Sequence, residues 1–169
     1  GSYAATVDRI VLGDDMSAVA ADLEQFLRIA TRAKVAASVQ LQTIARQVIA
    51  NLQGETTSPG SLSGADFDEV EFRAQLEAEV QPPILCRYYI FKSWIHYLHG
   101  DYYNALAEGE RAERMLSAIA GLFEGTMHMF TMGLTLVAIA PWIPVLLVAA
   151  VMLWAARHLI RRRRPTRTP

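Results

Sequence analysis

The sequence has no charged residue from Gly125 to Ala156, and its last acidic residue is Glu124. All 17 acidic residues therefore precede this stretch, whereas six of the 16 basic residues follow it. Residues 1–156 hold ten basic and 17 acidic residues, which gives this part of the chain a net charge of −7. An acidic body offers no electrostatic attraction to nucleic acid, so we expect no nucleic-acid partner.

Cysteine is almost absent as well. The single residue, Cys86, excludes a disulfide bond within the chain. It lies at the apolar start of a predicted helix, where a buried small side chain is a commoner role than a nucleophile. One cysteine is compatible with a reducing compartment, and we expect a cytoplasmic location.

The motifs of nucleotide chemistry are also missing. The chain contains no glycine-rich phosphate loop ending in Lys-Ser or Lys-Thr, and neither the His-Arg-Asp nor the Asp-Phe-Gly signature of a kinase. His96 and His99 form a candidate metal pair with Cys86 or His128, but a metal site needs three or four converging ligands. We therefore favour one histidine at the edge of the core and one on the surface. We expect no catalytic residue, cofactor or metal ion, and the chain is not predicted to be an enzyme.

Apolar residues recur at helical spacing through most of the chain, and strand-like alternation is missing. Gly13, Gly54 and Gly100 each follow a helical segment, and glycine readily adopts the left-handed backbone that ends many helices. The predicted helices before the central hairpin span residues 3–12, from 14–17 to 32, 34–52 and 67–80, the last with Asp66 or Asp68 as its N-cap. The polar segment 55–66 is predicted to be a surface connection.

The central segment, residues 88–112, predicts two helices joined at Gly100, with Asp101 as the N-cap of the second. Gly-Asp-Tyr followed by Ala105 and Ala112 resembles the second half of a tetratricopeptide repeat, in which an aromatic ring fills the gap between two helices and alanines let the backbones approach. We therefore predict an all-α fold of antiparallel helical hairpins, stacked as a degenerate tetratricopeptide-like array, with a hydrophobic C-terminal helix.

Five segments, taken in order, resemble the helical repeat region of very large bacterial multidomain signalling proteins. They are QVIANLQGET (47–56), FDEVEF (67–72), YYIFKSWIHYLHGDYYNAL (88–106), RAERML (111–116) and FEGTMHMFTMGLTL (123–136). In that family, serine/threonine-kinase-like and predicted ATPase domains precede the helical region, and GAF and sensor histidine kinase domains follow it. The resemblance implies a segment that contacts a protein partner or neighbouring domains of the same chain. Departures from the repeat pattern occur at Ser93, His96, Gly109 and Ser117.

The tyrosines of the central segment are the candidates for contact with a partner. Tyr89 and Tyr102 are predicted to lie between helices, which leaves Tyr88, Tyr97 and Tyr103 as the partner-binding candidates on the surface. Four methionines are interpreted as core filler rather than as a binding groove: Met115, Met127, Met129 and Met132.

The segment Leu134–Ala156 comprises 23 residues, and only Thr135, Pro141 and Pro144 interrupt its apolarity. About 20 apolar residues cross a membrane, and an aromatic and basic flank is typical of such a helix, so a membrane anchor is one interpretation. The prolines shorten the uninterrupted run to about 15 residues. The family resemblance ends near residue 136, so an aberrant terminus, truncated or read in another frame, is the second interpretation.

We accordingly divide the chain into a helical repeat segment, residues 1–136, and a hydrophobic helix with a basic tail, residues 137–169. The expected function is non-catalytic contact with a protein partner or with neighbouring domains, within a cytoplasmic bacterial sensor kinase or predicted ATPase signalling protein. The alternative is a small membrane-associated helical protein that is anchored through residues 134–156.

Overall fold

The computed structural model describes residues 2–162, with side chains over residues 3–142 and 145–155. Within residues 2–162 the chain forms eight α-helices and one 3-10 helix, with no β-strand, which confirms the predicted all-α class. The elements are α1 (Ser2–Leu12), α2 (Met16–Arg32), α3 (Ala36–Leu52), α4 (Glu69–Ala78), α5 (Pro82–Leu98), α6 (Tyr102–Glu113), η1 (Leu116–Ile119), α7 (Phe123–Ile139) and α8 (Trp142–Arg162). The predicted tail residues Arg163, Arg164 and Arg167 lie outside the described part of the chain.

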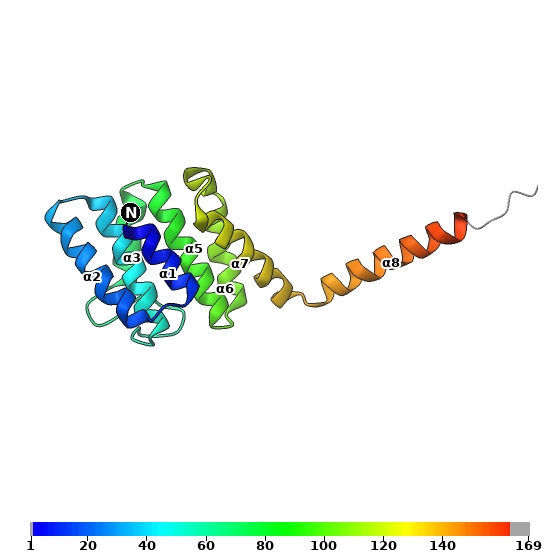
Figure 1. Cartoon of the computed structure of the whole chain (residues 1–169), viewed down its shortest axis with the longest axis horizontal. Helices are drawn as coiled ribbons and strands as arrows, with labels where there is room; N and C mark the ends of the chain where they lie inside the picture. Colours follow the sequence, from blue (N-terminus) through cyan, green and yellow to red (C-terminus); the bar gives the residue numbers. More distant parts are fainter. Residues whose placement is uncertain (1, 163–169) are drawn as a thin grey trace, which may run out of the picture.

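The helices before α8 form one packed body, and α8 projects away from it (Figure 1). α2 and α3 form a hairpin covered by α1, α3 packs on α5, and α5 and α6 form the most extensive helix pair. α7 packs against both α5 and α6, and α8 touches α7 near their junction. Among the described residues, no helix combines the length and the continuous apolarity that a membrane crossing requires.

Helix ends follow the predicted glycine positions. Gly13, Gly54 and Gly100 adopt left-handed backbone with φ of 78°, 77° and 76°. The backbone N–H after each glycine donates to the last turn of the preceding helix, as from Asp101 to the His96 carbonyl at 2.9 Å. Lys34 and Val80 take the same conformation, with φ of 55° and 49°, at the ends of α2 and α4, where no glycine stands.

Two predicted helix starts move by two residues. α3 begins at Ala36 rather than at Lys34, because Lys34 belongs to the left-handed turn that ends α2. α4 begins at Glu69 rather than at residue 67, because the Asp68 carboxylate caps the helix by accepting hydrogen bonds from the N–H groups of Val70 and Glu71. α7 runs to Ile139, so the predicted division at residue 136 falls inside a helix.

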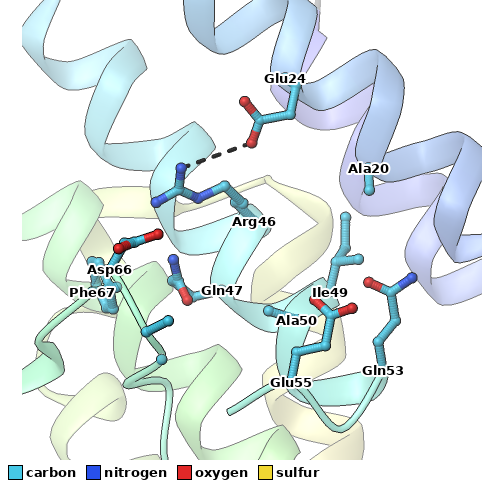
Figure 2. A pocket seen from close by; sticks show the side chains of 12 residues that line it. Ala20, Glu24, Arg46, Gln47, Ile49, Ala50, Gln53, Glu55, Asp66 and Phe67 are labelled. Atoms are coloured by element: carbon cyan, nitrogen blue, oxygen red, sulfur yellow. Dashed lines mark ion pairs between the residues drawn. The ribbon is translucent and has the colours of Figure 1, made fainter.

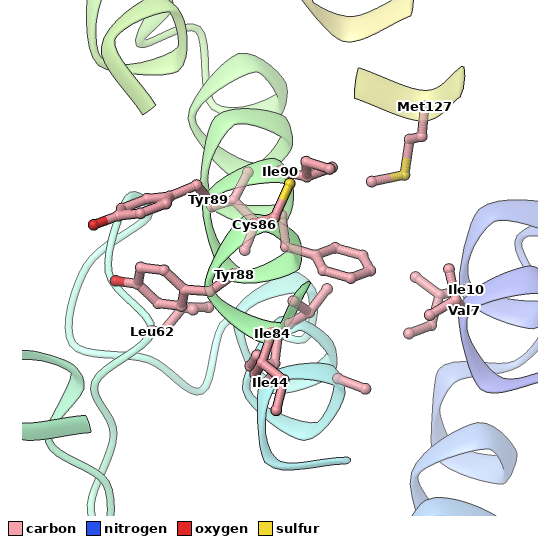
Figure 3. Packing of buried hydrophobic residues seen from close by; sticks show 14 of the residues in the cluster. Val7, Ile10, Ile44, Leu62, Ile84, Cys86, Tyr88, Tyr89, Ile90 and Met127 are labelled. Carbon is pink, nitrogen blue, oxygen red and sulfur yellow. The ribbon is translucent and has the colours of Figure 1, made fainter. Parts of the chain in front are cut away.

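The core is centred on α5, which buries side chains around most of its circumference (Figure 3). Val7 and Ile10 of α1 and Ile44 of α3 belong to the same buried cluster as the core residues of α5. Cys86 is fully buried, with its thiol 3.5 Å from the Ala112 carbonyl, as predicted for a small core side chain. Burial raises the pKa of this thiol to about 11, so the reactive thiolate is disfavoured.

The segment between α3 and α4 is not the surface connection that its composition predicts. Leu62 is buried in the core, and Gly60, Ser61 and Ser63 are half-buried. The Asn51 side-chain amide donates to the carbonyls of Pro59 and Ser61 at 2.9 Å each. The polar backbone of this segment can enter the interior because side chains of α3, α4 and α5 satisfy its hydrogen bonds.

Candidate protein-contact surface

The three tyrosines predicted to contact a partner do not form one exposed patch. Tyr88 is buried, and its hydroxyl donates a 2.7 Å hydrogen bond to Oε1 of Glu69, so its placement on the surface is wrong. Tyr97 is half-buried, with its ring centroid 5.8 Å from that of Tyr102. Tyr103 is 76% exposed and stands as predicted on the surface of α6.

Tyr88 is hydrogen-bonded to a buried ionic group that no pattern in the sequence predicts. The Glu69 carboxylate lies 2.7 Å from Nζ of Lys92 and accepts a 2.8 Å hydrogen bond from the Leu62 N–H. Burial raises the pKa of Glu69, but Lys92, the Leu62 N–H and the Tyr88 hydroxyl outweigh it and hold this pKa below the usual value. The Lys92 ammonium also donates to the Gly60 carbonyl. These contacts bind the segment before α4 to α5, so they serve the fold.

The two histidines of the candidate metal pair are structural as well. His96 is buried beside Asp101, with its Nδ1 3.1 Å from Oδ2, and a Cβ on Gly60 would lie only 2.7 Å from its ring. His99 is exposed, with Nε2 3.0 Å from Oδ1 of Asn51. In the part of the chain that the structure describes, no three His, Cys, Asp or Glu side chains converge closely enough to hold a metal ion.

A recess of about 370 Å³ lies between α2, α3 and the segment before α4 (Figure 2). Its charged groups include Arg46 and Glu24, which form an ion pair at 3.8 Å. The full lining is Ala20, Glu24, Arg46, Gln47, Ile49, Ala50, Gln53, Glu55, Gly64, Ala65, Asp66 and Phe67. None of these residues is a serine, cysteine, histidine or lysine, and the ionisable side chains are those of Glu24, Arg46, Glu55 and Asp66.

The faces of α7 are reversed relative to an ordinary surface helix. Its buried face consists of Glu124, Met127, His128, Thr131 and Thr135. Its exposed face, which we call the outer stripe, consists of Thr126, Met129, Phe130, Gly133, Leu136 and Val137. A surface helix normally turns its apolar side inward and its polar side to water. On α7 the side facing water is the more apolar one, which is typical of a surface that another polypeptide covers.

Specific contacts hold the polar face of α7 against α5 and α6. The Glu124 carboxylate lies 2.8 Å from Nε of Arg87 on α5, and both side chains are largely buried. The buried Thr135 hydroxyl is satisfied within α7 itself, where it donates to the Thr131 carbonyl at 2.8 Å. Gly109 of α6 lets α7 approach, because a Cβ at that position would collide with the sulfur of Met132. The orientation of α7 is therefore set by pairing and close packing on its inner side.

Burial also fixes the protonation of His128 on this inner face. Desolvation lowers the pKa of His128, while the charge of Glu113 raises it to a lesser extent. The neutral imidazole is therefore the form that the folded chain holds at neutral pH.

The outer stripe continues at its N-terminal end into a groove of about 410 Å³ between η1 and α7. Its lining is Leu116, Ile119, Ala120, Gly121, Leu122, Phe123, Gly125, Thr126 and Met129. Leu122 and Phe123 are exposed at the rim. Groove and stripe together form an apolar surface that runs along most of α7.

Sequence reasoning missed this surface. Met129 is two-thirds exposed, so its interpretation as core filler is wrong, whereas Met127 is buried as predicted. The exposure of Phe130, Leu136 and Val137 was not predicted. Residues 125–139 contain no Asp, Glu, Lys or Arg, so no charged face shows which side of this helix is exposed to water. The available signal was the recurrence of large apolar residues at 129/130 and 136/137, one heptad apart.

The chain matches no protein-family model, no curated protein and no solved structure.

Proposed function

We propose that this chain is a non-catalytic helical segment that makes contacts between proteins or between domains. The observation that carries the proposal is the outer stripe of α7, which exposes Met129, Phe130, Leu136 and Val137 while polar groups of the same helix are buried. Contiguous apolar surface of this kind favours burial against another polypeptide. The pairing of α2 with α3 and of α5 with α6, and the contact between α3 and α5, support our proposal of a tetratricopeptide-like array. In such an array, a helix at one end needs a further neighbour or a polar outer face.

The use of the ionisable groups supports a scaffold rather than an enzyme. The buried pairs Glu69–Lys92 and Glu124–Arg87 connect helices and loops inside the body. Each of these four groups has its partner within hydrogen-bond distance, so their charges are used in pairing inside the fold. From the resemblance of the sequence, we place the segment in a cytoplasmic bacterial sensor kinase or predicted ATPase signalling protein, where it joins a nucleotide-driven part to a phosphotransfer part.

Reading the gene in frame on both sides of this segment tests that setting. We expect kinase-like or ATPase motifs upstream and histidine-phosphorylation motifs downstream. A start codon directly before residue 1 and a stop codon directly after residue 169 would contradict the multidomain setting, although contact with a separate protein would still fit the outer stripe.

The second candidate is a small membrane-associated helical protein, and the exposed apolar side chains of α8 favour it. Val145, Leu146, Leu147 and Val148 are each more than half exposed. Extraction of cell membranes with alkaline carbonate separates the two proposals. Release of the chain into the supernatant favours a protein-contact segment, and retention in the membrane pellet favours the anchor and contradicts the first proposal.

A further inference from the structure

We propose that the partner of the outer stripe is a second copy of this chain, with α7 and α8 of each copy packing against α7 and α8 of the other. This inference deepens the proposed function, on which it rests, by naming the partner. It predicts a symmetric dimer built around a cluster of four helices, two from each protomer.

The first observation is the form of the outer stripe. Positions 126, 129/130, 133 and 136/137 recur every three to four residues, so they lie on one side of α7 over a length of about 16 Å. Gly133 stands in the middle, and a Cβ built there meets no atom within 4 Å. A small residue between Phe130 and Val137 leaves a shallow seat that allows the backbone of another helix to approach closely.

The second observation is that α8 has apolar side chains on all sides. Val145 to Val148 are four consecutive residues, and successive helical residues are turned by about 100°, so these side chains surround most of the helix axis. All four are exposed, and so are Val151, Met152 and Leu153. A helix that is apolar around its circumference is stable when neighbours cover it on more than one side. A single contact with one α7 leaves half of it in water, whereas the partner's α7 and α8 together cover both sides.

The third observation is the short junction between α7 and α8. It favours packing of α8 on the outer stripe of the partner rather than on the outer stripe of its own chain. α7 ends at Ile139 and α8 begins at Trp142, so only Ala140 and Pro141 connect them. In this structure α8 leaves the body and does not fold back along α7, and Phe130 stays 67% exposed (Figure 1). A connection this short and extended presents the second helix to another molecule, which is the arrangement found in exchanged dimers.

Charge favours the same arrangement. Residues 1–156 carry a net charge of −7, and six arginines follow them, of which Arg157, Arg161 and Arg162 lie within α8. The 21 residues of α8 are about 30 Å long, so an extended α8 carries its last turns, from residue 157 onward, several screening lengths from the body. Packing along a second copy places them close to an acidic body, where Glu110 and Glu113 are exposed on α6, the helix next to α7.

The test is the mass of the complete chain in solution, measured by sedimentation equilibrium over a range of concentrations, with circular dichroism as a check of folding. We expect a monomer–dimer equilibrium that Phe130→Glu weakens at least about 100-fold, because it places an unpaired charge at the centre of the interface. Val70→Glu is the matched control. Val70 is also 67% exposed, but it lies on α4 in the first turn, where a carboxylate suits the helix, so dimerisation should be unchanged.

A crosslink identifies the helices that meet. We expect Met129→Cys chains mixed with Leu146→Cys chains to give a disulfide-linked dimer on oxidation. Cys86 does not interfere because it is buried. The double variant at high dilution, with both cysteines in one chain, should give far less intramolecular product than the mixture gives dimer. Preferential closure within one chain would overturn the exchange.

Two further outcomes separate failure of the dimer from failure of the proposed function. A chain that is monomeric at every concentration, or a dimer that Phe130→Glu does not weaken, overturns the second copy as partner and leaves contact with a different protein intact. A chain that floats with vesicles of phosphatidylcholine and phosphatidylglycerol and resists carbonate extraction overturns both this inference and the proposed function.

Discussion

The helices α5 and α7 are both 17 residues long, and both lie in an apolar part of the sequence, yet the fold treats them in opposite ways. α5 buries Ile90, Phe91 and Ile95 at its centre, with neighbours on nearly every side. α7 buries Glu124 and His128 and leaves Phe130 in water. Apolar side chains in a helix favour burial. Which of them are buried within the chain depends on the helices that pack around that helix.

The largest expected effect is the difference between two phenylalanines. Phe91→Ala should lower the free energy of unfolding by about 4 kcal/mol, because it leaves a cavity at a fully buried position. Phe130→Ala should change this free energy by less than about 0.5 kcal/mol in the monomer, since the ring is mostly in water. Urea unfolding of dilute samples, followed by circular dichroism, measures both. Equal losses in the two variants would mean that the outer stripe is part of the monomer core.

The next effect concerns the polar side of α5. Lys92→Met should lower the free energy of unfolding by about 3 kcal/mol, because the Glu69 carboxylate is left buried without its cation. The same urea experiment checks it. Arg73→Met serves as the control, because its 3.8 Å pair with Glu77 is exposed and should contribute less than about 0.5 kcal/mol. A small loss in both variants would show that the buried pair does not hold the segment before α4 on α5.

Helix ends give a smaller effect, and here the change should stabilise the chain. Val80 is β-branched and exposed, yet it has φ of 49° at the end of α4. Val80→Gly should raise the free energy of unfolding by about 1 kcal/mol, since glycine relieves the strained left-handed backbone at some entropic cost. Gly100→Ala, at φ 76°, should lower it by about 1 kcal/mol. Thermal unfolding measures both shifts, and the same sign for the two would contradict this account.

The smallest effect is a dependence on pH from the inner face of α7. Unfolded His128 titrates near its usual 6.5, whereas burial lowers its pKa in the folded chain. Below pH 6.5, His128 therefore binds a proton in the unfolded chain but stays neutral in the folded chain. The free energy of unfolding falls as the pH falls from 6.5 toward the folded pKa. Above pH 6.5 this contribution does not change.

Urea unfolding between pH 7.5 and 5.5 measures that slope. We expect His128→Gln to reduce the slope without abolishing it, because burial, followed by the charge of Lys92, lowers the pKa of His96 as well. Glu69 acts only in a lower window. Its pKa is depressed from 4.5, so the stability it contributes is lost as the pH falls from 4.5 through the folded pKa. An unchanged slope in His128→Gln would show that this histidine is not held neutral by the fold.

Much of the fold followed from local signals in the sequence. The stops at Gly13, Gly54 and Gly100, the N-cap at Asp101 and the burial of Cys86 were all predicted and are present. The candidate contact site was predicted much less well. Of its three tyrosines, Tyr103 is exposed, Tyr97 is half-buried and Tyr88 lies in the core. A tyrosine has an apolar ring and a polar hydroxyl, so it can be buried where the hydroxyl has a hydrogen-bond acceptor such as Glu69. The spacing of tyrosines in the sequence does not show whether such an acceptor is present.

Short-range signals were enough to predict where α1, α3 and α5 end and where α6 begins, because caps and left-handed stops act between residues a few positions apart. Which segments are buried depends on contacts between helices that are far apart in the sequence. The segment before α4 is held in the interior by hydrogen bonds from Asn51 of α3 and Lys92 of α5, the helices before and after it in the sequence. On the inner face of α7, Glu124 pairs with Arg87, which is 37 positions away in the sequence. Burial depends on contacts between distant parts of the chain, so neither the polarity of a loop nor the apolarity of a helix shows in advance which side will face water.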